Sequence, residues 1–281
     1  MTSPDILLFK SPASNWENRI PLGNGRLGVM LKGGVTNESL QLNEENIWSG
    51  GPMDRNNLST KEYLPQVRSL MNEGKINDAQ EMAYRAMSGS TVNMRVYQTA
   101  GDFNIDFFTK KNFGVPGPMQ SHISENYSDY KMTLDMSTAT AKVIYKDDEG
   151  TTFTRTVFVS AVDDIIVMNV QADTKGKINF RGTLERGIWA DNVFTDGESV
   201  FLEDSHGIPF CAGVTAICLG GKKSVVGTCL CGEDVDEVIF LIAIKTFDKI
   251  RGKGKPNNLS EYSKMILKNT WTPACKNQLS E

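Results

Sequence analysis

Histidine is scarce in this chain: its 281 residues include only His122 and His206. Histidine is the usual general base of nucleophilic catalysis and a common zinc ligand, and no Gly-x-Ser-x-Gly motif is present. Cysteine is also sparse. Cys229 and Cys231 would point to the same face of a strand, and both histidines lie far from them in the sequence. We therefore expect no metal, no cofactor and no self-contained active site.

Excess positive charge and long apolar runs are absent as well. Thirty basic and 34 acidic residues give a net charge of −4, so there is no general attraction to the phosphates of a nucleic acid. The best apolar run, Val238 to Ile244, has the length of a strand, whereas a membrane-spanning helix needs about 20 residues. The first ten residues resemble no secretory signal. We expect no nucleic acid partner, no membrane partner and a cytoplasmic protein, or a secreted one whose leader has been removed.

Short strands bounded by turn residues dominate the rest of the chain. The clearest unit is a predicted hairpin, in which β-branched and aromatic residues from Ala139 to Tyr145 and from Thr151 to Ser160 flank a polar loop that ends in Gly150. Further strands are expected at 28–32, 39–42, 102–107, 165–172, 177–184, 210–219, 223–231 and 237–244. This pattern predicts a mainly β protein with a large antiparallel β-sandwich.

Helical periodicity interrupts the strands in one place. Apolar residues recur at steps of three and four from about Thr60 to Met87, with Gly74 between them, which predicts a short insertion of two helices near 60–88. A second helical pattern, Leu259 to Asn269, follows a linker rich in Gly, Pro and Asn. We therefore predict a β-sandwich domain over 1–248, followed over 249–281 by a linker and the beginning of a helical connection.

Two motifs contain polar residues suited to a site. Gly23-Asn-Gly-Arg-Leu-Gly28 matches the dinucleotide pattern GxGxxG, but a strand is expected after it where a helix N-terminus is required. We therefore expect the glycines to shape a tight turn. The segment from Gln41 to Pro52 combines amides, carboxylates and an aromatic residue, as sugar sites do. The same residues could instead brace a loop. Glu44 and Glu45 would point to opposite faces, which excludes a facing acid and base pair.

Short acidic runs occur at three further places. The runs at 147–149, 163–164 and 233–237 lack the spacing of an EF-hand and coincide with expected turns. We interpret these acidic residues as parts of solvated turns.

The order of these motifs resembles glycoside hydrolase family 95, the α-L-fucosidase-like enzymes, over most of residues 6 to 270. The resemblance rests on Trp16-Glu-Asn-Arg-Ile-Pro-Leu-Gly-Asn-Gly-Arg-Leu-Gly28 and on Leu40-Gln-Leu-Asn-Glu-Glu-Asn-Ile-Trp-Ser-Gly-Gly-Pro52. Tyr97-Gln98, Gly101-Asp-Phe103 and Thr154 to Ser160 follow in the expected order. Similarity thins beyond Asp191.

The resemblance implies an N-terminal β-sandwich that, in the family, precedes an (α/α)6 barrel. That barrel removes α-linked L-fucose or L-galactose with inversion, and it carries the family's catalytic residues. We therefore assign no catalytic residue, expect this chain alone to be inactive, and name the missing C-terminal catalytic domain as its partner. The candidate residues of a substrate-side or interdomain loop are Asn24, Arg26, Asn43, Glu44 and Trp48.

The alternative function is a stand-alone carbohydrate-binding sandwich without hydrolase activity. Its partner would be an oligosaccharide, held on an exposed aromatic side chain such as Trp48 or Trp189.

Overall fold

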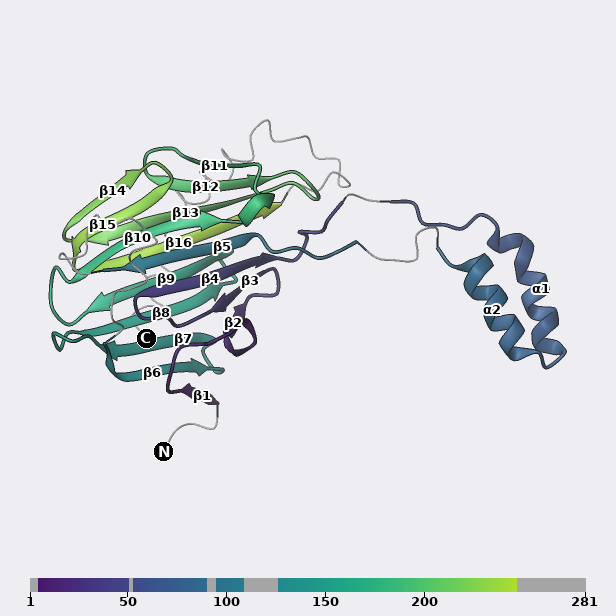
Figure 1. Cartoon of the computed structure of the whole chain (residues 1–281), viewed down its shortest axis with the longest axis horizontal. Helices are drawn as coiled ribbons and strands as arrows, with labels where there is room; N and C mark the ends of the chain where they lie inside the picture. The colour runs from purple at the N-terminus through teal and green to yellow at the C-terminus, as the bar shows by residue number, and fades with distance from the viewer. Residues whose placement is uncertain (1–4, 51–52, 90–94, 109–125, 247–281) are drawn as a thin grey trace. The chain divides into compact units, whose positions relative to one another are not determined.

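The computed structural model describes residues 5–50, 53–89, 95–108 and 126–246. They form two compact units. The first unit combines Met1–Ile47 with Gln98–Glu281, and the second is the insertion Trp48–Tyr97 (Figure 1). The predicted linker and C-terminal helix lie outside the described residues, so the domain boundary near residue 248 stays a prediction.

The first unit consists of two antiparallel sheets, which confirms the predicted β-sandwich (Figure 1). The nine-stranded sheet has the spatial order β1 (Ile6–Phe9), β6 (Ser128–Asp135), β7 (Thr140–Lys146), β8 (Thr152–Ser160), β9 (Ile165–Ala172), β16 (Glu237–Thr246), β13 (Phe210–Leu219), β12 (Ser199–Asp204) and β11 (Asn192–Thr195). The seven-stranded sheet has the order β14 (Lys222–Val226), β15 (Cys229–Val235), β10 (Ile178–Glu185), β5 (Gly101–Phe107), β4 (Asn37–Glu44), β3 (Leu27–Leu31) and β2 (Ile20–Gly23).

Within the ranges that the structure describes, this unit also contains two short 3-10 helices. Helix η1 (Trp16–Asn18) precedes β2, and η3 (Gly187–Trp189) lies between β10 and β11.

The main core lies between the two sheets. Alternate side chains of each strand point into it, and Phe240 of β16 contacts Phe103 and Phe180 of the opposite sheet at centroid distances of 5.4 and 4.9 Å. A second buried apolar cluster includes Phe158, Val167 and Leu241. Strands β9 and β16 are therefore buried on both faces over most of their length, which explains why they read as continuous apolar runs.

Most predicted strands are present, but the single strand expected over 223–231 is wrong. The chain reverses there, and β14 and β15 form a hairpin in which Val226 pairs with Cys229. Gly227 in the turn has a φ of 60°, a conformation that glycine adopts without steric cost. Only Gly227 and Thr228 separate Val226 from Cys229, and this break is too short to interrupt the apolar pattern on either side of it.

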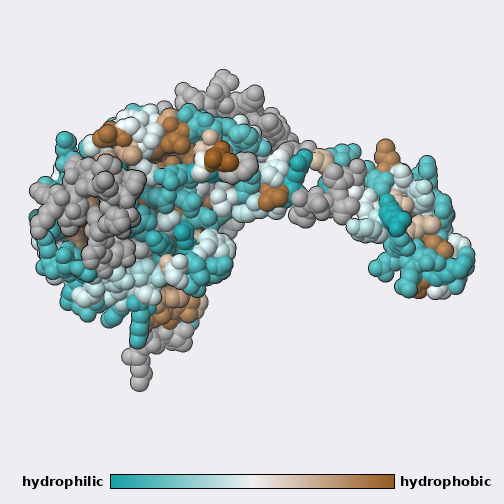
Figure 2. Space-filling view, in the orientation of Figure 1, coloured by the Kyte–Doolittle hydropathy of each residue, from teal (hydrophilic) through white to brown (hydrophobic). Residues whose placement is uncertain are grey.

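The second unit contains the predicted helical hairpin. Helix α1 (Thr60–Asn72) and helix α2 (Ile76–Met87) are joined through Gly74, whose φ is 76°. Val67 and Ala79 are the buried helical residues of the pair, and other apolar side chains remain exposed in separate patches (Figure 2). No helix within the described ranges is long and apolar enough to cross a membrane.

Candidate functional site

The turn between β2 and β3 carries the glycine motif. The side-chain oxygen of Asn24 accepts hydrogen bonds from the backbone N–H groups of Arg26 (2.9 Å) and Leu27 (2.7 Å), while Gly25 has a φ of 93°. This Asx-type turn reverses the chain within a hairpin. The motif shapes a tight turn, as the sequence predicts.

Asn24 and Arg26 connect this turn to the opposite sheet. The Asn24 side-chain amide donates to the carbonyl of Ser160 at 3.0 Å. The Arg26 guanidinium pairs with the carboxylate of Asp164 and donates to the carbonyl of Ile244 at 3.1 Å. Because Ser160 and Ile244 belong to β8 and β16, these two side chains join the β2–β3 turn of one sheet to two interior strands of the other.

Glu44 completes the contact from the last residue of β4. Its side chain is completely buried and lies 3.2 Å from the Arg26 guanidinium. It also accepts hydrogen bonds from the backbone N–H of Asn46 (2.8 Å), the side-chain amide of Asn46 (3.1 Å) and the hydroxyl of Thr246 (3.3 Å). Glu44 thereby ties its own loop to the final residue of β16.

Asp164 is a member of this group that sequence patterns do not reveal. Its segment is a turn, as expected, but the interpretation as a purely solvated turn is wrong for Asp164. Its carboxylate contacts Arg26 and also lies 2.6 Å from the ammonium of Lys245. Its φ is 57°, a left-handed conformation that Asp adopts more readily than most residues. Only the folded chain brings 26, 164 and 245 together, so local sequence signals could not have found the contact.

We call these residues the inter-sheet cluster: Asn24, Arg26, Glu44, Asp164, Lys245 and Thr246. Two carboxylates and two cations balance its charge. Glu44 is enclosed, and its carboxylate is engaged by four donor groups, so it is poorly placed to exchange protons with a substrate. The geometry suits mechanical bracing of the β2–β3 turn, the end of β4 and the end of β16.

The other two candidates are not members of this cluster. Asn43 is the neighbour of Glu44 on β4, pairs with Gly28, and points to the opposite face of the strand, where it is half-buried. Trp48 belongs to the second unit, where it pairs with Tyr97 in an isolated bridge and meets its ring edge-on at 5.4 Å. The sequence groups all five candidates in one loop. In the structure, three of them belong to the inter-sheet cluster, Asn43 lies on the other face of β4, and Trp48 belongs to the second unit.

A second polar group lies at the end of β12. His206 Nδ1 lies 2.9 Å from a carboxylate oxygen of Asp204 and 3.1 Å from one of Asp191. The hydroxyl and backbone N–H of Ser205 donate to Asp191, and these bonds, together with His206 and Arg186, lower the pKa of its carboxyl. Arg186 also pairs with Asp204. Since a guanidinium already occupies the most buried carboxylate, we assign no metal to this group.

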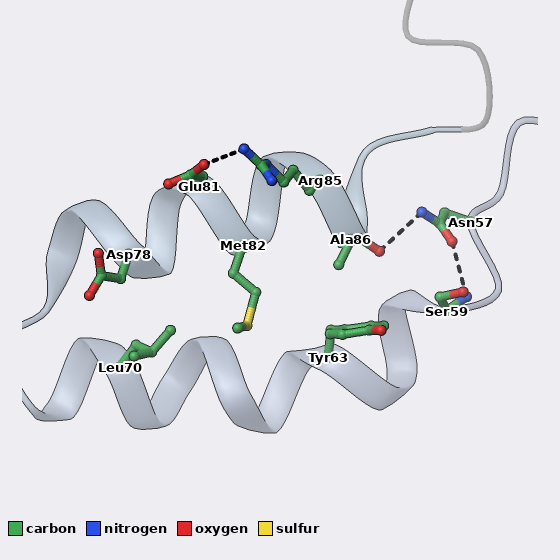
Figure 3. A pocket seen from close by; sticks show the side chains of 9 residues that line it. All are labelled: Asn57, Ser59, Tyr63, Leu70, Asp78, Glu81, Met82, Arg85 and Ala86. Carbon is green, nitrogen blue, oxygen red and sulfur yellow. Dashed lines mark hydrogen bonds and ion pairs between the residues drawn. The ribbon is translucent and has the colours of Figure 1, made fainter.

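The helical hairpin has an open groove between its two helices. Tyr63 and Leu70 of α1 and Met82 of α2 point into it, while the ion pair of Glu81 and Arg85 lies at its rim (Figure 3). The groove holds no cluster of catalytic groups, and we assign no chemistry to it.

Comparison with known families adds a finding that the geometry alone does not give. Residues 7–249 match the family described as "Glycosyl hydrolase family 65, N-terminal domain". The chain belongs to this family. The prediction of a glycoside hydrolase N-terminal domain is thus confirmed, although the matched family has the number 65, and the narrower assignment to family 95 remains for the proposal below.

Curated relatives of this glycoside hydrolase N-terminal domain carry fucosidase names. It is 35% identical over 181 residues to "Alpha-L-fucosidase 2" of Arabidopsis thaliana, which covers 64% of the chain and 20% of that protein. It is 28% identical over 154 residues to "Probable alpha-fucosidase A" of Aspergillus oryzae, covering 51% and 18%. The chain therefore spans about a fifth of the length of these relatives.

A solved structure supports the fold of the domain. The "Putative kojibiose phosphorylase from human microbiome" superposes with a TM-score of 0.50 at 9% identity, covering 99% of this chain and 37% of that one. At this identity, the similarity shows the fold alone.

Proposed function

We propose that this chain is the non-catalytic N-terminal domain of an α-L-fucosidase-like glycoside hydrolase of family 95. Hydrolysis of α-L-fucosyl or related linkages would be carried out by a catalytic domain that follows in the longer protein. The family match and the fucosidase names of relatives about five times as long as the matched region support this assignment.

The inter-sheet cluster is the observation that carries the proposal in structural terms. Glu44 holds Thr246, and Asp164 holds the adjacent Lys245, where β16 ends. Two elements that are far apart in the sequence thereby fix the position at which the chain continues. We infer that the sandwich orients the following domain from this end, with Asn24, Arg26 and Glu44 acting as bracing residues and not as ligands of the sugar.

The decisive experiment compares L-fucose release from 2′-fucosyllactose by two proteins. One is the 281-residue chain, and the other is the same chain extended by the residues that its gene encodes beyond 281. Release by the extended protein alone is the expected result. Release by the short chain would contradict the non-catalytic role, and release by neither would contradict the fucosidase assignment.

A variant of the extended protein tests the orienting role. Lys245→Met removes one cation from Asp164 at the end of β16, and we expect several-fold slower release of L-fucose with the fold retained. Lys142→Met, at an exposed position of β7, is the matched control and should change nothing. Equal rates of L-fucose release by the two variants would contradict the orienting role of this end of the sandwich. They would not contradict the assignment of the chain as a non-catalytic N-terminal domain.

A further inference from the structure

The outer face of the seven-stranded sheet carries a regular array of polar side chains. Strand pairing aligns Ser39 of β4 with Asn104 of β5 and Thr183 of β10. The next row along the strands aligns Gln41, Asp102 and Glu185. Since the alternate residues of these strands enter the core, all six side chains belong to one face.

These residue types are unusual for their position. Strands β4, β5 and β10 are the central strands of this sheet. Asn and Asp are depleted in strands because they do not pack well on a pleated surface, whereas Thr, Val and Tyr are favoured. At the outward positions of β5 the sequence nevertheless places Asp102, Asn104 and Asp106 in succession. Residues that are unfavourable for a strand but occur on its outward face are expected where that surface has a function.

An exposed tryptophan lies beside the array. Trp16 of η1 is 54% exposed, and its indole N–H donates to the side-chain oxygen of Gln41 at 2.6 Å. Arg19, which follows η1, approaches the hydroxyl of Ser39 at 3.5 Å. The hydrogen bond fixes the position of the aromatic ring next to amide and carboxylate groups while leaving much of its surface open to solvent.

Hydrogen bonds also orient the polar groups. Glu185 accepts from the Asn104 amide at 3.3 Å and from the Thr183 hydroxyl at 3.2 Å. A carboxylate has about four acceptor positions and an amide has two donors and an acceptor, so these contacts leave capacity for a ligand. Burial raises the pKa of the Asp102 carboxyl, the positive charge of Arg19 opposes this, and the negative charge of Glu185 raises it further. The array therefore offers both donors and acceptors, with carboxylates that disfavour a polyanion.

We propose that this face, bounded by Trp16 and by Glu185, binds a neutral oligosaccharide. Sugar hydroxyls require clustered amide and carboxylate partners, and the apolar C–H face of a sugar ring packs against an aromatic side chain. The array supplies the amide and carboxylate partners for the hydroxyls, and Trp16 supplies the aromatic surface for the ring. The existence of this site does not depend on the fucosidase assignment.

The test is a titration of the isotope-labelled 281-residue chain followed by nuclear magnetic resonance. Trp16→Phe identifies the indole N–H resonance of Trp16 by its loss. The probes are 2′-fucosyllactose and maltoheptaose. We expect at least one probe to shift this resonance with a Kd of about 1 mM, the weak range of a small contact.

Variants then locate the contact by calorimetry. Trp16→Ala should weaken binding by about tenfold or more, since an aromatic contact and its buried area are lost. Asn104→Ala should weaken oligosaccharide binding several-fold. This second variant allows the proposal to be tested even if Trp16→Ala does not fold. Asn192→Ala, an exposed asparagine on β11 of the other sheet, is the matched control and should bind as the unaltered chain does.

Two results would overturn the proposal. One is the absence of any shift of the Trp16 resonance with either probe at millimolar concentrations. The other is binding that survives both Trp16→Ala and Asn104→Ala. If neither probe binds and Trp16 becomes shielded from a fluorescence quencher in the extended protein, this face is a protein contact and not an oligosaccharide site. L-fucose release by the extended protein is measured independently of all these outcomes.

Discussion

The guanidinium of Arg155 lies 3.3 Å from the carboxylate of Glu38, and both side chains are completely buried between the two sheets. Arg155 also donates to the carbonyl of Val35 at 2.5 Å and to the hydroxyl of Tyr145 at 2.8 Å. Glu38 accepts from the backbone N–H of Gly33 at 2.9 Å. This buried ion pair links β8 of the nine-stranded sheet to β4 of the seven-stranded sheet, and removing either partner would leave the other charge buried and uncompensated.

We expect Arg155→Met to lower the free energy of unfolding by about 3–5 kcal/mol, since Glu38 is then left buried without its cation. Urea denaturation measures the change. Arg181→Met is the matched control, because Arg181 forms a half-exposed pair with Asp106 at 2.8 Å, and its loss should cost less than about 1 kcal/mol. Similar losses for the two variants would show that buried Glu38 does not depend on its cation.

The same pair predicts how stability depends on pH. Burial raises the pKa of Glu38 above its ordinary value of 4.5, although the positive charge of Arg155 opposes this. The folded state therefore holds this proton at a pH where the unfolded state has released it, so stability falls as the pH rises from 4.5 through the raised pKa. For every tenfold difference in proton affinity between the folded and unfolded states, this loss amounts to about 1.4 kcal/mol.

The measurement compares the unaltered chain with Glu38→Gln by urea denaturation over a range of pH. Glutamine cannot ionise, so the variant should lose this part of the pH dependence, and the difference between the two curves should level off above the raised pKa. Parallel curves across the whole range would show that Glu38 does not titrate differently in the folded state.

Glu44 tests the bracing role of the inter-sheet cluster. Its carboxylate is buried and accepts hydrogen bonds from Asn46 and Thr246. Glu44→Ala should lower the free energy of unfolding by about 1–3 kcal/mol, because Arg26, Asn46 and Thr246 lose their acceptor and a completely buried side chain is truncated. The adjacent Glu45 is exposed, and Glu45→Ala should change stability by less than about 0.5 kcal/mol. A loss from Glu44→Ala as small as this control would favour a contact with ligand or another domain over bracing.

Gly182 tests how closely the core is packed. A methyl group at Gly182 would lie 2.8 Å from the ring of Phe103, whereas one at Gly28 would lie 3.6 Å from the nearest atom of Asn43. Gly182→Ala should therefore cost about 1–3 kcal/mol through overpacking, and Gly28→Ala should cost less. Thermal unfolding of the two variants checks the order, and the reverse order would contradict this account.

The strands and the helical hairpin can be predicted because their signals are local. Runs such as Phe210–Leu219 and the periodic residues between Thr60 and Met87 contain their own pattern. The break at Gly227 escapes prediction because a two-residue turn barely interrupts an apolar run. Strand β1, only four residues long, has no clear pattern and is defined by its pairing with β6.

The candidate site is only partly predictable for the same reason. The sequence identifies Asn24, Arg26 and Glu44, which occupy one cluster, but it groups them with Trp48, which belongs to the other unit. The acidic pattern places Asp164 in a solvated turn, and nothing in the sequence indicates Lys245. Asp164 lies 138 positions from Arg26 and 81 positions from Lys245 in the chain, and contacts at such separations leave no local signal in the sequence.

The sequence by itself determined the β-rich architecture, the two-helix insertion and the relationship to glycoside hydrolases, because hydrophobic periodicity, turn residues and ordered motifs are local properties of the chain. Only the tertiary structure decided that Arg26 meets both Glu44 and Asp164, that Asp164 also meets Lys245, and that Trp16 lies beside Gln41. Those contacts depend on how strands far apart in the sequence pair and how the two sheets pack, and that arrangement exists only once the chain has folded.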